Sequence, residues 1–224
     1  MMCHMPEPHI QLPIEFDVLA TFVSAVAGAL VAVRRRYDYV GVFALAFVSG
    51  LGGALLRDGV FLQNGPPAVV RDNRILLAVL AATLVVIGIN QLGRRLSLLV
   101  LIFDTIGLGV YAVVGADRAQ AAGLGQLGAV LVGVVNAVGG GMMRDVLTRE
   151  EPVIFKPGQL YGLAALVASA LYVAVTTVLD GAEELAALIA AVAGIVLRFL
   201  AVRYDWKTRP LYWKDWQQHG GSVG

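Results

Sequence analysis

Seven apolar runs, each close to the length of a bilayer-spanning helix, dominate this sequence and leave only short segments between them. A helix needs about 20 mainly apolar residues to cross the hydrocarbon core, and in lipid every backbone polar group must find a partner within the protein. The sequence therefore predicts an all-α membrane protein with seven transmembrane helices. The runs are Leu12–Val33, Tyr39–Leu56, Ile75–Leu92, Leu96–Ala116, Gly123–Met143, Pro157–Leu179 and Leu185–Val202.

The composition argues against several classes of function. Hydrophobic residues make up 58% of the 224 residues and charged residues 15%, whereas soluble domains have about 45–50% and about 25%. The net charge of +1 provides no basic face for nucleic acid. Cys3 is the single cysteine, and the histidines have no metal-ligand spacing. We expect neither an enzyme nor a cofactor or metal site, because the sequence has no Walker, zinc or nucleophile-elbow motif and the dinucleotide-like Gly123-x-Gly125-x-x-Gly128 lacks a βαβ unit around it.

The basic residues are distributed unevenly over the loops. One set of alternate loops, together with the tail 204–224, contains most of them, including Arg34–Arg36 and Arg94–Arg95, whereas the other set contains few, such as Arg71 and Arg74. Because Lys and Arg accumulate on the cytoplasmic side, we expect an inner-membrane protein with its N-terminus outside and its C-terminus in the cytoplasm. The aromatic and basic tail is expected to anchor at the inner leaflet, and a lipid-regulated element is the alternative.

A short glycine and Arg-Asp pattern occurs twice, 87 residues apart, as GGALLRD in Gly52–Asp58 and GGGMMRD in Gly139–Asp145. The same shift aligns residues 16–61 with 103–148 without a gap, and 14 of these 46 positions are identical. Each copy contains three spans, so the second copy enters the membrane from the opposite side. We therefore expect two inverted three-helix repeats. The predicted segments are 12–92, 96–179, a seventh helix at 185–203 and the tail.

The glycines of the pattern are expected to interrupt the second and fifth spans. An interior glycine costs a helix about 1 kcal/mol relative to alanine, and a freed backbone group in lipid must line a wet cavity or find another partner. We expect kinks that expose carbonyl groups to a cation pathway. Close helix packing through small residues is the alternative. The residues concerned are Gly52, Gly53, Gly139, Gly140 and Gly141.

Charged residues also recur within the spans: Asp17, Arg57, Asp58, Asp104, Arg144 and Asp145. Adjacent residues on a helix do not face each other, so Arg57 and Asp58 are each expected to need another partner. Charges within a bilayer usually face a cavity or an opposite charge. We therefore expect an Asp17–Arg57 pair and an Asp104–Arg144 pair, one at each end of a single pathway. The alternative leaves Asp17 and Arg57 in the outer headgroup region.

Three further polar residues are candidates for the same pathway. Ser49 and Asn136 match each other in the repeat, three residues before the glycines, and hydrogen bonding between helices is the alternative role. Lys156 opens the sixth span and is a candidate for the pore mouth or for a lipid phosphate. The alternative is an ordinary lysine whose ammonium group reaches the interface.

At the glycine and Arg-Asp motifs the sequence resembles one known family, the trimeric intracellular cation channels, and in particular the bacterial and archaeal members of that family. The resemblance rests on the two Gly-Gly motifs with Arg-Asp and on Lys156-Pro157-Gly158-x-x-Tyr161, and it covers about residues 12–203. It implies a homotrimer whose subunits each hold a pore for K⁺ and other monovalent cations, bent by the glycines. Animal members have a Lys-Glu-Val type motif where this chain has Gly-Leu-Gly-Gly-Ala, so their phosphoinositide regulation is not implied.

Prokaryotic relatives have also been described as glycine transporters, which leaves a second hypothesis. A small amino-acid transporter would use the same inverted repeat, with helix ends binding carboxylate and ammonium groups. Arginines beside the pathway would repel cations and favour the transporter, whereas pairing with Asp17 and Asp104 removes that objection. A trimeric membrane scaffold without transport is the third hypothesis.

Overall fold

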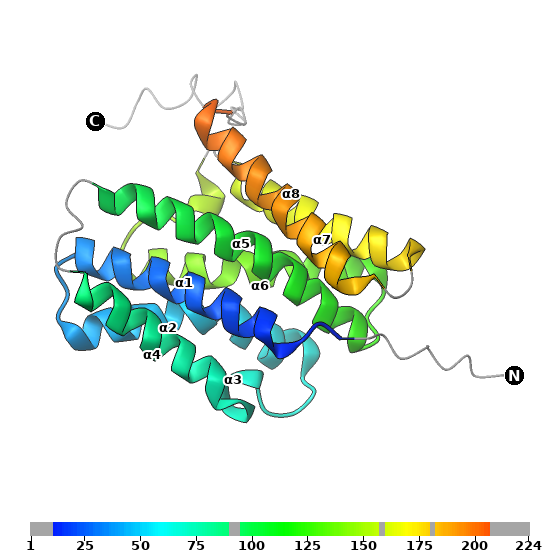
Figure 1. Ribbon diagram of the computed structural model, residues 1–224, viewed down its shortest axis with the longest axis horizontal. Helices are drawn as coiled ribbons and strands as arrows, with labels where there is room; N and C mark the ends of the chain where they lie inside the picture. The colour runs from blue at the N-terminus through cyan, green and yellow to red at the C-terminus, as the bar shows by residue number, and fades with distance from the viewer. Residues whose placement is uncertain (1–10, 90–94, 157–159, 180–181, 207–224) are drawn as a thin grey trace, which may run out of the picture.

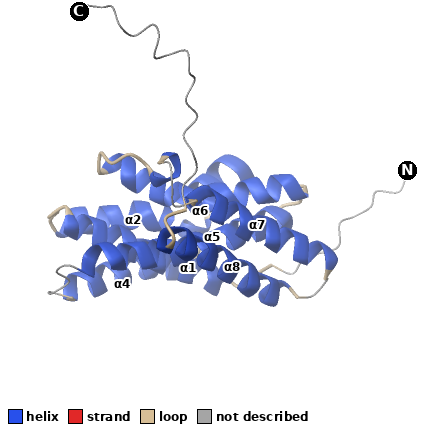
Figure 2. Ribbon diagram, turned by 90° about the horizontal axis from the view of Figure 1, so that it is seen from above, coloured by secondary structure: helices blue, strands red, loops and turns tan. Residues whose placement is uncertain are grey.

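The computed structural model describes residues 11–89, 95–156, 160–179 and 182–206, and every regular element in these ranges is helical (Figures 1 and 2). This confirms the predicted all-α class. The α-helices are α1 Ile14–Arg34, α2 Tyr39–Leu56, α3 Ala68–Arg71, α4 Asn73–Gly88, α5 Leu96–Ala121, α6 Gln126–Leu147, α7 Tyr161–Val178 and α8 Glu183–Arg203. A π-helical segment, Arg57–Leu62, continues α2, and a 3₁₀ turn, Val153–Phe155, follows α6.

Six of the helices are long and apolar enough to cross a membrane: α1, α2 with its π-helical continuation, α5, α6, α7 and α8. The predicted third span corresponds to α4, which is apolar but has only 16 residues. That is shorter than the roughly 20 residues that a full crossing needs. The chain is therefore a multi-pass membrane protein with six clear spans and one shorter apolar helix in its described part.

The four helices α1, α2, α5 and α6 form the centre of the molecule (Figure 1). Helix α4 packs on α1 and α2, whereas α7 packs on α5 and α6, and α8 packs on α5 and α7. Helices α1 and α5 are neighbours that run in opposite directions, because Asp17 near the start of α1 contacts Arg118 near the end of α5. The large exposed side chains of α4, α7 and α8 are mostly leucine, isoleucine and valine, as a lipid-facing surface requires.

The glycines of the repeated pattern lie where α2 crosses α6. A Cβ atom added to Gly53 would lie 1.9 Å from the carbonyl oxygen of Asn136, and one added to Gly140 would lie 2.2 Å from that of Ser49. Both helices remain α-helical through their glycines, so the expected interruption of the helix is not found there. Small residues let two backbones approach closely in a membrane, and this packing offsets the low helix propensity of glycine. Pore lining by these glycines stays a prediction.

Buried hydroxyl groups connect the central helices. The Tyr111 hydroxyl on α5 donates a hydrogen bond to the Gly50 carbonyl on α2 and shares one of 2.8 Å with Thr21 on α1. Tyr172 on α7 donates to Asp117 on α5 at 2.8 Å. These contacts join helices that are far apart in sequence, and a buried polar group without a partner is costly in such surroundings.

Replacing Tyr111 with phenylalanine is expected to lower the stability of the purified protein by about 1–3 kcal/mol, because the Gly50 carbonyl and the Thr21 hydroxyl lose a buried partner. The melting temperature in detergent measures this loss. Tyr204→Phe is the matched control, since Tyr204 is 63% exposed. Equal melting temperatures for the two variants would contradict the structural role of the Tyr111 hydroxyl.

Candidate functional site

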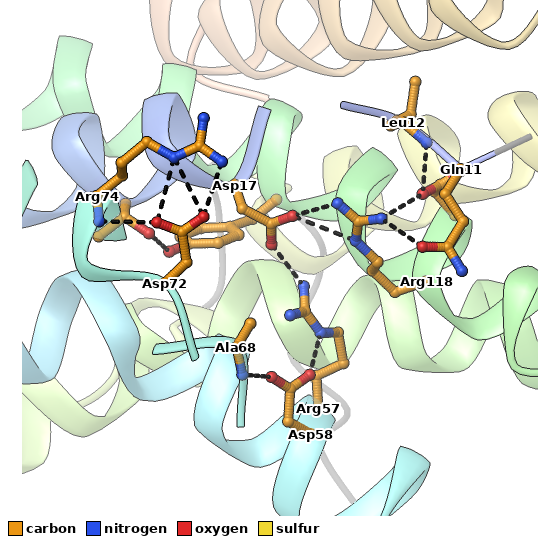
Figure 3. Close-up of polar contacts among 12 residues, drawn as sticks. Gln11, Leu12, Asp17, Arg57, Asp58, Ala68, Asp72, Arg74 and Arg118 are labelled. Carbon is orange, nitrogen blue, oxygen red and sulfur yellow. Dashed lines mark hydrogen bonds and ion pairs between the residues drawn. The ribbon is translucent and has the colours of Figure 1, made fainter. Parts of the chain in front are cut away.

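The first charge cluster surrounds Asp17, on the first turn of α1, and we call it the Asp17 cluster. Its Oδ1 atom accepts a hydrogen bond from Arg57 Nη1 at 3.1 Å, and its Oδ2 atom accepts two from Arg118, at 2.7 and 3.2 Å (Figure 3). The expected Asp17–Arg57 pair is therefore present. Both side chains are almost completely buried within the protein, and their depth in the membrane stays a prediction.

Arg57 also pairs with its neighbour Asp58. Arg57 Nε donates to Asp58 Oδ1 at 2.6 Å, and Asp58 Oδ2 accepts the backbone N–H of Ala68 at 2.9 Å. The prediction that these adjacent residues do not face each other is wrong. Successive Cβ atoms do diverge on a helix, but the long arginine side chain folds back far enough for its Nε to reach the neighbouring carboxylate.

The second charge cluster surrounds Asp104 on α5, and we call it the Asp104 cluster. Arg144 Nη1 donates to Asp104 Oδ1 at 2.7 Å, which is the second expected pair. Arg144 also contacts Asp145 Oδ1 through Nε at 3.0 Å and through Nη2 at 2.9 Å. Asp145 Oδ2 then accepts the backbone N–H of Val153 at 3.2 Å. The two ion pairs of Arg57, with Asp17 and Asp58, thus recur 87 residues further along the chain.

Each cluster has a second arginine that the sequence analysis did not assign to it. Arg118 joins Asp17, and Arg198 on α8 lies 3.7 Å from Asp104 Oδ2, with its guanidinium 4.2 Å from the Tyr161 ring centroid. Arg118 follows the end of the predicted span Leu96–Ala116, whereas α5 extends to Ala121 and contains it. Arg198 was the one basic residue within the seventh run, and a charge in an apolar span is a recognised functional signal.

Once these arginines are counted, the charges in both clusters are compensated. The Asp104 cluster combines Asp104 and Asp145 with two arginines and is electrically neutral. The Asp17 cluster combines two arginines with Asp17, Asp58 and Asp117, which lies 3.7 Å from Arg118, so its arginine charges are fully compensated. Buried charges need such compensation, because removing one partner leaves an uncompensated charge in a medium of low polarity. A neutral cluster also repels a passing cation much less than the bare arginines would.

The Asp17 cluster borders a cavity of about 550 Å³, which we call the Asp17 cavity. Its walls come from the start of α1, the end of α5 and the segment from the π-helix to the start of α4. Asp72 lies at its edge and accepts hydrogen bonds from the backbone N–H and the side chain of Arg74. These hydrogen bonds lower the pKa of Asp72 below its ordinary value, so this carboxylate is ionised at neutral pH.

The remaining predicted site residues lie apart from the two clusters. Ser49 and Asn136 are buried near the α2–α6 crossing, and Asn136 Nδ2 donates to the Tyr111 carbonyl at 2.7 Å. This contact fits the alternative of hydrogen bonding between helices, while pathway lining stays a prediction. Lys156 is exposed after the 3₁₀ turn, and the adjoining residues 157–159 lie outside the described part of the chain.

Known proteins resemble this chain in sequence and in fold. A family model described as "Glycine transporter" matches residues 15–91 and again residues 101–177. The structure is also similar to that of the TRIC trimeric intracellular cation channel orthologue from Rhodobacter sphaeroides. The TM-score is 0.80, with 32% identity over 85% of this chain and 97% of that chain. The chain belongs to the TRIC family.

Further relatives agree with this family. The UPF0126 inner membrane protein YadS of Escherichia coli K12 is 32% identical over 192 residues, which cover 85% of this chain and 92% of YadS. A structure that concerns conductance through TRIC cation channels has a TM-score of 0.75 and 28% identity, covering 89% of this chain and 97% of that chain. The resemblance predicted from the glycine and Arg-Asp motifs is thereby confirmed. These TRIC relatives are membrane proteins and channels, not enzyme families.

Proposed function

We propose that this chain is a monovalent cation channel, selective for K⁺ or permeable to both K⁺ and Na⁺, with one pore in each subunit of a homotrimer. The observation that carries the proposal is the pair of clusters in which carboxylates compensate the buried arginines, one at the start of α1 and one near the start of α5. The similarity to solved TRIC channels supports it. Membrane lipid is the expected surrounding partner, and a lipid bound between subunits fits the apolar outer surface.

The pathway is proposed to follow two inverted three-helix repeats, with α8 as the seventh helix. Two observations support this arrangement: the family model matches the chain twice, and the glycine contacts recur after 87 residues, as Gly53 with Asn136 and Gly140 with Ser49. The distribution of Lys and Arg supports an N-terminus outside the cell and a C-terminus in the cytoplasm. The Asp17 cluster then lies at the outer end and the Asp104 cluster at the inner end.

A channel of this kind is expected to depend on the neutrality of its inner cluster. Asp104→Asn leaves Arg144 and Arg198 with one carboxylate, so a positive charge remains beside the pathway. We expect the unitary K⁺ current in planar bilayers to fall about threefold or more, because a positive charge beside the pathway repels a cation and raises the barrier to its passage. Glu150→Gln is the control, since Glu150 pairs with Arg34 and Arg35 at the surface.

The same preparation separates the channel from the glycine carrier, the second candidate, which the family description favours. Unitary K⁺ currents from the purified wild-type protein support the channel. Saturable uptake of glycine into vesicles, without such currents, would establish the carrier and overturn the proposal. Preserved currents in Asp104→Asn would contradict the role given to the cluster.

A further inference from the structure

The short segment before α1, residues 11–13, is held against the end of α5 by two neighbouring side chains, and we call it the N-terminal strap. The backbone N–H of Leu12 donates to Asp117 Oδ2 at 3.2 Å, and Arg118 Nη1 donates to Gln11 Oε1 at 3.1 Å (Figure 3). To the residues that the structure describes, Gln11 and Leu12 make no hydrogen bond between backbone groups. Within the described ranges, the polar hold on these two residues therefore comes from side chains of α5.

Asp117 connects the strap to a third element. Its Oδ1 atom accepts a hydrogen bond from the hydroxyl of Tyr172 on α7 at 2.8 Å, while its Oδ2 atom accepts the bond from the strap. The Leu12 side chain is buried in the core formed by α5, α6, α7 and α8. The strap thus rests on one apolar side chain and two hydrogen bonds, and a segment with so few contacts opens at a lower free energy than a packed helix.

Two cavities meet at the strap. Gln11 and Leu12 belong to the wall of the Asp17 cavity and also to the wall of a second cavity of about 560 Å³. The rest of the second wall comes from Pro13 and from the start of α8. The strap is therefore a partition between the two spaces. Its removal would join them and widen the approach to the Asp17 cluster.

The shift of 87 residues that relates the two motifs gives the strap no counterpart. It places Leu12 on Leu99, which lies inside α5, and it places Asp117 on Leu30, an apolar residue of α1. The duplicated motif therefore forms its ion pairs at the Asp104 cluster without a strap. A contact that the motif does not need for its own fold, at one end of the molecule only, is a candidate for control of that end.

We propose that Asp117 is a positioning residue that holds the N-terminal strap as a gate at the Asp17 cavity. With its contact to Leu12 made, the strap separates the two cavities, and when the contact breaks, Leu12 leaves its core and the cavities join. Arg118 links this movement to the ion pairs, because the same guanidinium binds Gln11 and Asp17. As a gate the strap rests on the proposed channel function, whereas its opening is measured without any current.

Cysteine labelling of the full chain in lipid nanodiscs measures the opening of the strap. In a Cys3→Ser background, the variants Leu12→Cys and Val132→Cys each place a single thiol in the same core, where the native side chains are 2% and 1% exposed. We expect a water-soluble maleimide to modify Leu12→Cys at least about tenfold faster, because opening the strap costs less than opening the helix core. Equal rates for the two variants would overturn the proposal.

Asp117→Asn, added to both labelling variants, tests the role of the carboxylate. The amide replaces one accepting oxygen with a donor group, so one of its two contacts is lost and the other is weakened. We expect Leu12→Cys to be labelled at least about threefold faster and Val132→Cys to stay within about twofold. Asp72→Asn makes the same chemical change where the partner is Arg74, and it is expected to change neither rate. An equal rise at both thiols would show a merely structural role for Asp117 and overturn the proposal.

Gln11 provides a test that spares the core, because its side chain is exposed. Gln11→Glu turns the hydrogen bond with Arg118 into a stronger, charge-assisted one, and Gln11→Ala removes it. We expect labelling of Leu12→Cys to be about threefold slower in the first variant and about threefold faster in the second. The fraction of time that unitary K⁺ currents are open is expected to fall in the first and rise in the second.

The two measurements separate the strap from the channel. Unchanged labelling in both Gln11 variants would overturn the strap and leave the channel proposal standing. Shifted labelling with an unchanged open fraction would overturn the role of the strap as a gate. Wild-type protein without K⁺ currents would overturn the channel proposal, while the labelling rates would still report whether the strap opens.

Discussion

Gly53→Ala is expected to destabilise the protein by about 3 kcal/mol or more, at the upper end of what overpacking in a core costs. The new methyl group would lie 1.9 Å from the carbonyl oxygen of Asn136 and 2.9 Å from its carbonyl carbon. Both are backbone atoms of α6, so no side chain can turn away to make room. The helices α2 and α6 would have to separate, and the contacts on both sides of the crossing would be lost.

The melting temperature of the purified protein and its yield after gel filtration measure this effect. Gly140→Ala is expected to behave in the same way, because its methyl group would meet the Ser49 carbonyl oxygen at 2.2 Å. Gly128→Ala in the same helix is the control, since its nearest neighbour would be an ordinary contact at 3.6 Å. Similar melting temperatures for all three variants would show that α2 and α6 do not cross closely at the glycines.

Arg144→Met is expected to destabilise the protein by about 3–5 kcal/mol, because it removes the central cation of a buried cluster and leaves its carboxylates uncompensated. Asp104 and Asp145 both contact Arg144 within 3.0 Å, and Arg198 lies further away, at 3.7 Å from Asp104. Thermal melting in detergent measures the loss. Arg74→Gln, at an exposed ion pair with Glu15, is expected to leave the melting temperature unchanged.

A charge exchange separates pairing from mere loss of charge. Asp104→Arg combined with Arg144→Asp restores opposite charges at the same two positions. We expect this double variant to be more stable than either single variant, because directly contacting residues are not additive in their effects. A double variant that folds no better than the single ones would show that Asp104 and Arg144 act separately.

The glycine and Arg-Asp motif illustrates what sequence reasoning could and could not reach. The 87-residue shift matched Asp17 with Asp104 and Arg57 with Arg144, and the inverted topology placed one aspartate and one arginine at each end of the pathway. Both expected pairs, Asp17–Arg57 and Asp104–Arg144, are present in the structure. The same shift has no counterpart for Arg118 or Arg198, which come from helices outside the motif. Their contact with the aspartates depends on how α5 and α8 pack against their neighbours, and a repeat within the sequence carries no information about that packing.

The sequence by itself determined the helices, the membrane environment and the duplicated motif, because the length of an apolar run and the cost of unpaired backbone groups in lipid are local properties. It also determined which residues carry charge within the spans. Only the tertiary structure decided that the glycines serve a close crossing of α2 and α6, that Asp17 and Asp104 each contact two arginines, and that Arg57 lines a cavity. These features depend on distances between side chains far apart in the chain, and the packing of the helices sets those distances.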